Sequence, residues 1–348
     1  ARHITGTSIP ETYVTAMRSS IVVLSALLGR MGEGRSCYPG GCLIGARPID
    51  LHLMALQALG AEIKEHEGLI EARCRDAQGL KGTEIHLPYP SVGATEQAIL
   101  ASVLAKEVTV IHGAAKEPEI SQLCRFLNNM GAVICGMGTD HLMIQGVEEL
   151  HDSSFRVEGD RIVAGTYAAA VMAAMGSITL KEVRAAELEL PLEMHKRSGA
   201  SIQKDSCCRQ IRIEMKKRPL PLDIKTGPYP EFPTDLQSPY MAFLASGQGT
   251  STIVEQVFEG RFATAKALVQ MGAAVETEGQ RAVIKGSYPL KGASVYASDL
   301  RGGAALAVAA LAAEGETLIN DCQHIERGYE DICRDMAALG ADIRWLDK

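Results

Sequence analysis

The chain has 348 residues, is 46% hydrophobic but only 5% aromatic, and carries 34 glycines and a formal net charge of −7. A chain of this length buries roughly 75% of its unfolded surface, so its nine cysteines, which follow no disulfide-framework spacing, favour a reducing cytoplasm. The acidic balance, the lack of a polybasic run and apolar runs far shorter than the ~20 residues of a transmembrane helix exclude nucleic-acid and membrane partners.

A helix-ending pattern occurs five times along the chain, at intervals of 68 to 73 residues. In each copy an apolar run with helical periodicity stops at a glycine, and a strand then begins. The copies are LGAEI (59–63), MGAVI (130–134), SGASI (198–202), MGAAV (271–275) and LGADI (339–343). Coincidence is a poor explanation for five copies, so we predict an internal repeat.

Helix starts recur at a similar spacing, each with small or hydroxyl residues where free backbone N–H groups need partners. They are TAMRSSIVVL (15–24), SVGATEQAIL (91–100), IVAGTYAAAV (162–171), PTDLQSPYMA (233–242) and SDLRGGAALA (298–307). One unit is therefore predicted as helix, strand, helix and two further strands, such as LIEARC (69–74) and TEIHLP (83–88). This period exceeds that of solenoid repeats, which favours a layered α/β protein with a few compact units per domain.

The repeat also predicts the limits of the domains. Counting back one period from Leu59 passes the first residue, so we expect one unit to be missing before the first visible copy. The second and third visible units are separated by FRVEGDRIV (155–163), which puts the domain boundary near Val157–Ile162. We therefore predict domains at 1–158 and 159–348.

The first candidate functional residue is Cys42, in the stretch SCYPGGCLIGARPIDLH (36–52). A flexible loop exposes a thiol, and a nearby guanidinium such as that of Arg47 lowers its pKa. The residues alone leave two readings open, a reactive thiol or a structural one in a tight turn. A zinc site made by Cys37, Cys42 and His52 is disfavoured, because the spacing is loose and no second tight ligand pair exists.

Four arginines stand at predicted element boundaries: Arg18, Arg47, Arg301 and Arg327. Taken singly, each fits a surface ion pair better than a binding site. Arginine grips phosphate and carboxylate with two hydrogen bonds, and helix N-termini also bind anions. Together, beside small-residue helix starts, the arginines predict a ligand that carries phosphate.

Asp235 lies at a helix start in PYPEFPTDLQSP (228–239), after three prolines that stiffen the approach. An aspartate there is usually only an N-cap, and the alternative is a general base held near a substrate hydroxyl. The sequence has no GxxxxGK[ST] loop, no HExxH and no GxSxG motif. We therefore expect neither a cofactor nor a metal.

Seven stretches strongly resemble UDP-N-acetylglucosamine enolpyruvyl transferases. They are PGGCLIGARPIDLH (39–52), SVGATE (91–96), KEPEI (116–120), FPTDLQ (232–237), FEGRF (258–262), SDLRGG (298–303) and ERGYE (326–330). The resemblance runs from about Ala16 to the C-terminus. It implies an inside-out α/β barrel of two domains, each built from three βαβαββ units, a fold shared with enolpyruvylshikimate-phosphate synthase.

The resemblance also implies the reaction and the catalytic residues. The enzyme would move the enolpyruvyl group of phosphoenolpyruvate to the 3′-hydroxyl of UDP-N-acetylglucosamine and release phosphate, the first committed step of peptidoglycan synthesis. Cys42 would act as a lid residue and proton donor, and is the thiol that fosfomycin alkylates. Asp235 would lie next to the attacking hydroxyl. Arg47 and Arg327 would bind phosphoenolpyruvate, and Arg301 is a further arginine of the cleft, which closes with Gly40–Gly41 as the hinge.

The implied sugar-nucleotide contacts are Arg18, Arg47, Pro48, Ile49, Asp50, Leu51, Tyr89, Pro90, Ser91, Val92, Gly93 and Val257. Some relatives have a lysine at the position of Tyr89. The family's first unit also carries a Lys-Asn pair that this chain does not contain. A protein that binds UDP-sugar without turnover is therefore one alternative, and the same chemistry on another acceptor is a second. A repeat scaffold is disfavoured, because these units do not form an extended concave surface.

Overall fold

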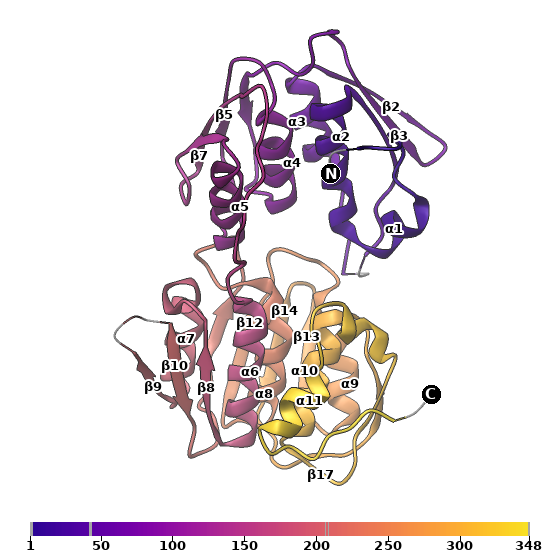
Figure 1. Ribbon diagram of the computed structural model, residues 1–348. Coiled ribbons are helices and arrows are strands. Elements are labelled where there is room, and N and C mark those ends of the chain that lie inside the picture. Colours follow the sequence, from indigo (N-terminus) through magenta and orange to yellow (C-terminus); the bar gives the residue numbers. More distant parts are fainter. Residues whose placement is uncertain (1–2, 42–43, 206, 208, 347–348) are drawn as a thin grey trace. The chain divides into compact units, whose positions relative to one another are not determined.

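The computed structural model describes residues 3–41, 44–205, 207 and 209–346. This part of the chain forms two compact units (Figure 1). The first comprises residues 3–41 and 47–157, and the second comprises 158–346 together with the loop segment 44–46. No helix among the described residues is long and apolar enough to span a bilayer.

The first unit contains two sheets, with strand orders β1-β3-β2 and β4-β5-β7-β6. Its elements are α1 (Glu11–Ala16), the 3-10 turn η1 (Arg18–Val22), α2 (Val23–Met31), β1 (Glu33–Cys37), α3 (Asp50–Ala58), β2 (Ala61–His66), β3 (Leu69–Cys74), β4 (Glu84–His86), α4 (Val92–Ser102), β5 (Val108–His112), α5 (Pro118–Asn129), β6 (Val133–Cys135) and β7 (His141–Gln145).

The second unit contains sheets β8-β10-β9 and β11-β12-β14-β13, and the strand pairs β15-β17 and β16-β18. Its elements are α6 (Arg161–Ala174), β8 (Ser177–Lys181), η2 (Ala185–Leu188), α7 (Glu189–Arg197), β9 (Ser201–Lys204), β10 (Gln210–Glu214), β11 (Asp223–Lys225), η3 (Thr234–Leu236), α8 (Gln237–Ala245), β12 (Thr250–Val254), η4 (Arg261–Ala263), α9 (Thr264–Gln270), β13 (Ala274–Glu278), β14 (Arg281–Lys285), β15 (Leu290–Lys291), β16 (Ser294–Tyr296), α10 (Leu300–Ala310), β17 (Ala313–Glu314), β18 (Leu318–Asn320), η5 (Cys322–Arg327) and α11 (Ile332–Ala338).

The predicted repeat is confirmed by the sheet topology. In β4–β7 and in β11–β14 the first two strands run parallel around a helix, and the last two pair antiparallel. The glycines of the five helix-ending copies all have φ between +83° and +105°, a conformation that glycine adopts without a steric penalty.

Two details of the predicted unit are wrong. TEIHLP does not close the first visible unit, because its strand β4 pairs in parallel with β5 and so begins the next unit. No strand follows the last copy, LGADI, within residues 341–346. A strand needs a neighbour with which to exchange hydrogen bonds, and the described chain supplies none there.

The helices form the interior of each unit, and the sheets face outward. In the second unit α6, α8 and α10 pack against one another, and every residue of α8 is buried. In the first unit α4 packs against α2 and α3. The strands alternate buried and exposed residues, as in β7 and β10, so each sheet keeps one face in water. A helix that is apolar on all sides requires this burial.

The N-cap of α6 provides a test of the fold. The Asp160 carboxylate accepts hydrogen bonds from the backbone N–H groups of Ile162 (2.7 Å) and Val163 (3.0 Å). We expect Asp160→Ala to lower the free energy of unfolding by about 1 kcal/mol, measured by urea titration. Asp342→Ala removes an exposed carboxylate that follows the last helix and should change it by less than about 0.5 kcal/mol. Equal effects would contradict the assigned cap.

Candidate active site

Asp235 lies in a single 3-10 turn, η3, between Pro233 and helix α8. The N-cap positions of η3 and α8 are occupied by Pro233 and Leu236, so the N-cap reading left open by the sequence is wrong. Instead the carboxylate contacts the guanidinium groups of Arg261 and Arg301, the latter at 3.7 Å. The turn therefore holds a carboxylate between two cations.

Arg261 is the buried member of this group, with its side chain only 2% exposed. A buried charge is stable only when it is paired and hydrogen-bonded. Arg261 pairs with one oxygen of Asp235, lies 4.0 Å from the Asp299 carboxylate, and donates from Nε to the Thr234 carbonyl at 3.4 Å. Sequence reasoning did not single out Arg261, although it lies in the FEGRF motif that carried the resemblance.

Arg301, at the start of α10, approaches Asp235 from the other side. Its Nη1 donates to the Tyr329 hydroxyl at 3.2 Å, and its guanidinium lies over the Tyr329 ring, 5.6 Å from the centroid. Asp299 caps the same helix by accepting from the Arg301 and Gly302 N–H groups. The cap and the tyrosine together orient Arg301.

The guanidinium groups set the electrostatics of Asp235. Burial opposes ionisation and raises the carboxyl pKa, but the charges of Arg261, Arg301 and Arg161 outweigh it, so the net pKa is lowered. Burial likewise lowers the pKa of Arg301, and Asp235 and Tyr329 reverse that effect and raise it. Asp235 is therefore ionised at neutral pH, in surroundings that suit an anionic ligand better than a metal cation.

Glu255, buried at the end of β12, organises the backbone around Asp235 and Val257. One carboxylate oxygen accepts from the Thr234 hydroxyl at 2.9 Å, next to Asp235. The other accepts from the N–H groups of Val257 (2.8 Å) and Phe258 (3.1 Å). Glu255 was also missed by the sequence analysis, because a single glutamate after a strand has no distinguishing pattern.

Residues 44–46 are the described part of the loop that follows Gly41, and they lie beside the backbone of Gly260. Ile44 is buried, and its carbonyl accepts a hydrogen bond from the Gly260 N–H at 2.9 Å, one residue before Arg261. Cys42 itself lies outside the described residues. Arg327 has an exposed side chain at the end of η5, two residues before Tyr329.

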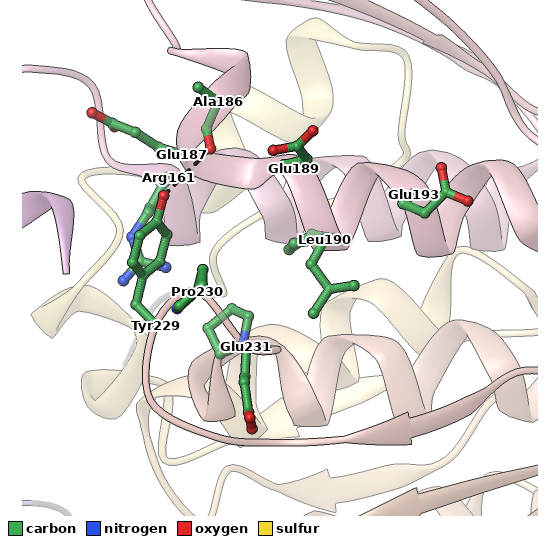
Figure 2. Close-up of a pocket in the computed structure, with 11 residues that line it drawn as sticks. Arg161, Ala186, Glu187, Glu189, Leu190, Glu193, Tyr229, Pro230 and Glu231 are labelled. Carbon is green, nitrogen blue, oxygen red and sulfur yellow. Dashed lines mark hydrogen bonds between the residues drawn. The ribbon is translucent and has the colours of Figure 1, made fainter. Parts of the chain in front are cut away.

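Asp235, Arg261 and Arg301 form the Asp235 cluster. A hollow of about 270 Å³ lies beside it and is lined in part by Arg161 and Pro233. Figure 2 shows that Glu189 and Glu193 on α7 line the hollow, with Glu231 across from them. The other residues that line the hollow are Ala186, Glu187, Leu190, Pro191, Tyr229 and Pro230. The Tyr229 hydroxyl donates to the Ala186 carbonyl at 3.4 Å. Four glutamates against one arginine make this hollow a poor site for a phosphate.

In the first unit, Arg18 and Arg47 lie close together. The Arg18 guanidinium donates to the carbonyl oxygens of Arg47 and, at 3.1 Å, of Pro48. Burial and the neighbouring Arg47 charge lower the pKa of Arg18. Like charges held this close are stabilised by an anion. Of the residues that follow, Pro48 and Asp50 are exposed, Ile49 is buried, and Leu51 is half-buried in the first turn of α3.

The turn Tyr89–Gly93 leads from β4 into α4, and Ser91 is the N-cap of that helix. The Ser91 side chain accepts from the Ala94 N–H at 3.3 Å, and Tyr89 is 43% exposed. A Cβ at Gly93 would lie 2.7 Å from Cε1 of His52. Only glycine therefore fits over the buried His52 ring. Together with Pro90 and Val92, these residues form a compact helix N-terminus of the kind that binds anions.

The sequence suggested His52 only as a poor zinc ligand. In the structure it is buried on α3, against Gly93. It is 7% exposed on α3, and burial lowers its pKa to about 4; the Gln97 side chain opposes this shift and the Arg18 charge adds to it. The ring is therefore neutral at neutral pH and supports Gly93 without adding charge.

Comparisons with known proteins identify the family of this chain. Residues 1–336 match the EPSP synthase (3-phosphoshikimate 1-carboxyvinyltransferase) family model. UDP-N-acetylglucosamine 1-carboxyvinyltransferase 2 of Caldanaerobacter subterraneus subsp. tengcongensis is 45% identical over 344 residues, 99% of this chain and 81% of that protein. The UDP-N-acetylglucosamine 1-carboxyvinyltransferase of Zymomonas mobilis subsp. mobilis is 47% identical over 98% of this chain and 79% of its own. This chain belongs to the UDP-N-acetylglucosamine 1-carboxyvinyltransferase family. It is therefore a transferase.

Solved structures confirm the predicted inside-out α/β fold. The enolpyruvyl transferase NikO of Streptomyces tendae has a TM-score of 0.85 at 23% identity, covering 97% of this chain and 80% of its own. EPSP synthase of Acinetobacter baumannii has a TM-score of 0.68 at 18% identity, covering 92% and 76%. At such identities the likeness bears on the fold alone.

The burial of His52 predicts how stability depends on pH. Its folded-state pKa of about 4 lies below its ordinary value of 6.5, so the unfolded chain binds more protons between these values and the folded state loses stability as pH falls. We expect a loss of about 2 kcal/mol between pH 7.5 and pH 5 from this residue. Urea unfolding at both pH values should show it in the wild type and not in His52→Gln. An equal loss in both proteins would contradict the assignment.

Proposed function

We propose that this protein transfers the enolpyruvyl group of phosphoenolpyruvate to the 3′-hydroxyl of UDP-N-acetylglucosamine, releasing phosphate, in the first committed step of peptidoglycan synthesis. The observation that carries the proposal is a carboxylate held ionised between two guanidinium groups, in a chain 45–47% identical to named UDP-N-acetylglucosamine 1-carboxyvinyltransferases. The thiols of Cys37, Cys74, Cys124, Cys135, Cys322 and Cys333 form no disulfide, which supports a cytoplasmic location.

Addition across the double bond of phosphoenolpyruvate needs a base for the sugar hydroxyl and an acid for carbon 3. Asp235 has the properties of the base. It is ionised, and two arginines fix its orientation. A carboxylate with a lowered pKa is a weak base, so it takes the proton as the new C–O bond forms rather than before. The tetrahedral adduct then loses a proton from carbon 3 and expels phosphate.

The arginines supply the charge that the substrates require. Arg47, Arg301 and Arg327 are proposed to bind the phosphate and carboxylate of phosphoenolpyruvate and the charge that develops during the reaction. The net charge of −7 repels such anions, so local guanidinium groups must overcome it.

The first unit is proposed to bind the uridine diphosphate part of the sugar nucleotide. In the first unit, Arg18, the stretch Arg47–Leu51 and the turn Tyr89–Gly93 offer guanidinium groups and a helix N-terminus to the uridine diphosphate. In the second unit, Val257 is held by Glu255 and is proposed to contact the sugar. The neutral His52 beneath Gly93 keeps this turn close-packed.

Cys42 is proposed as the proton donor and as the thiol alkylated by fosfomycin. The proposal rests on its sequence, between Gly40–Gly41 and Arg47. The described segment just after it supports this role, because Ile44 is fixed by a hydrogen bond next to Arg261.

The role of Asp235 is tested by Asp235→Asn, which keeps the shape of the side chain and removes its charge. We expect kcat for phosphate release to fall by about 10²- to 10⁴-fold, while calorimetric binding of UDP-N-acetylglucosamine is retained. The control Asp223→Asn changes an exposed carboxylate on β11 and should leave kcat unchanged. A loss below tenfold in Asp235→Asn would remove this residue from the proton transfer.

Cys42 is tested by Cys42→Ala, with Cys135→Ala, an exposed thiol on β6, as the matched control. We expect Cys42→Ala to lose phosphate release by about 10²-fold or more and to lose the mass increase that fosfomycin produces. The control should keep both. An unchanged rate in Cys42→Ala would end the assignment. Binding of the sugar nucleotide by the wild type without phosphate release would favour the inactive, UDP-sugar-binding alternative.

A further inference from the structure

Three histidines lie side by side across the outer face of the sheet β4-β5-β7-β6. In the strand register His86 of β4 is opposite His112 of β5, and His112 is opposite His141 of β7. Their neighbours Ile85, Ile111 and Leu142 are buried. Since side chains alternate between faces along a strand, the histidines all point away from the core.

Glu84 lies two residues before His86 and so projects from the same face of β4. Its carboxylate oxygen is 3.5 Å from Nε2 of His86 and 3.8 Å from Nε2 of His112. The ligand atoms of these three residues all lie within 4.8 Å of one another. The His112 Nε2 is buried and has no hydrogen-bond partner, which leaves an imidazole nitrogen unsatisfied in the centre of the group.

We propose that Glu84, His86 and His112 form a binding site for a divalent transition-metal cation of the zinc class. Two imidazole nitrogens and one carboxylate oxygen are a donor set that suits zinc and disfavours magnesium and calcium, which prefer oxygen ligands alone. With bonds of about 2.1 Å, ligand atoms in a tetrahedral zinc site are about 3.4 Å apart. The distances from Glu84 to the two imidazoles are close to this value.

Small side-chain rotations complete the geometry. The rings of His86 and His112 are stacked, with centroids 4.4 Å apart and planes 4° from parallel, so they must tilt toward each other to share one cation. His141 stands edge-on to His112 with centroids 5.0 Å apart, and its Nδ1 is 2.8 Å from an Asp140 carboxylate oxygen. That pairing occupies the Nδ1 of His141, and among the described residues only Glu84, His86 and His112 bring their ligand atoms together, so water fills the fourth position.

A cation here joins adjacent strands at the point where β4 leads into the turn Tyr89–Gly93. It binds the folded sheet and not the unfolded chain, so it stabilises the fold by mass action. The site is separate from the Asp235 cluster, and its test does not depend on the proposed reaction.

The test uses the full chain, freed of metal by chelation, with calorimetric titration by Zn²⁺ and thermal unfolding with and without Zn²⁺. We expect His112→Ala to bind one Zn²⁺ fewer per chain than the wild type, and Glu84→Gln to bind that ion at least tenfold more weakly. The Zn²⁺-dependent rise in Tm should disappear in His112→Ala.

His66→Ala is the matched control, because His66 is an exposed histidine beside a glutamate on another sheet of the same unit. It should bind Zn²⁺ as the wild type does. Circular dichroism without metal checks that each variant folds, and Glu84→Gln changes an exposed side chain outside the core. Equal stoichiometry, affinity and Tm shift in all four proteins would overturn the proposal and leave the group as a stacked histidine ladder.

Discussion

The surroundings of Asp235 in the second unit depend on a buried cation, the guanidinium of Arg261. With only 2% of its side chain exposed, Arg261 must be neutralised by groups the chain brings to it. Asp235, Asp299 and the Thr234 carbonyl serve that purpose, although they come from separate parts of the sequence. The need to satisfy this cation fixes Asp235 in its turn and brings it within 3.7 Å of Arg301.

This arrangement has a chemical consequence. A carboxylate already ionised and oriented in a folded site needs no reorganisation when a substrate hydroxyl arrives, and preorganised charge is the largest source of catalysis in many enzymes. Asp235 and Asp299 lie near Arg261, and Asp235 also pairs with Arg301, so the two carboxylates are held by the two guanidinium groups. The first unit also concentrates positive charge in one place. Arg18 and Arg47 lie close together, and Gly93 at the N-terminus of α4 packs over the neutral His52.

Features that depend only on neighbouring residues, such as helix boundaries, were predicted from the sequence. The helix-ending glycines and small-residue helix starts revealed the repeat, and Asp235 and Arg301 stood out at element boundaries. Arg261 and Glu255 were missed because their meaning depends on partners more than twenty residues away. TEIHLP was assigned to the wrong unit because a strand pattern does not reveal its pairing partner. The histidine group was missed for the same reason, as only strand register places His86, His112 and His141 together, and the sequence expectation of no metal considered local motifs alone.

Titration of the Asp235 carboxyl group shows whether the neighbouring guanidinium groups hold it ionised. Carbon-13 NMR of the labelled protein, with the signal assigned by its loss in Asp235→Asn, gives the pKa. We predict a pKa below the ordinary ~3.9 of aspartate and a higher pKa in Arg301→Gln, which removes one cation. A value at or above the ordinary one, unchanged by that substitution, would contradict this prediction.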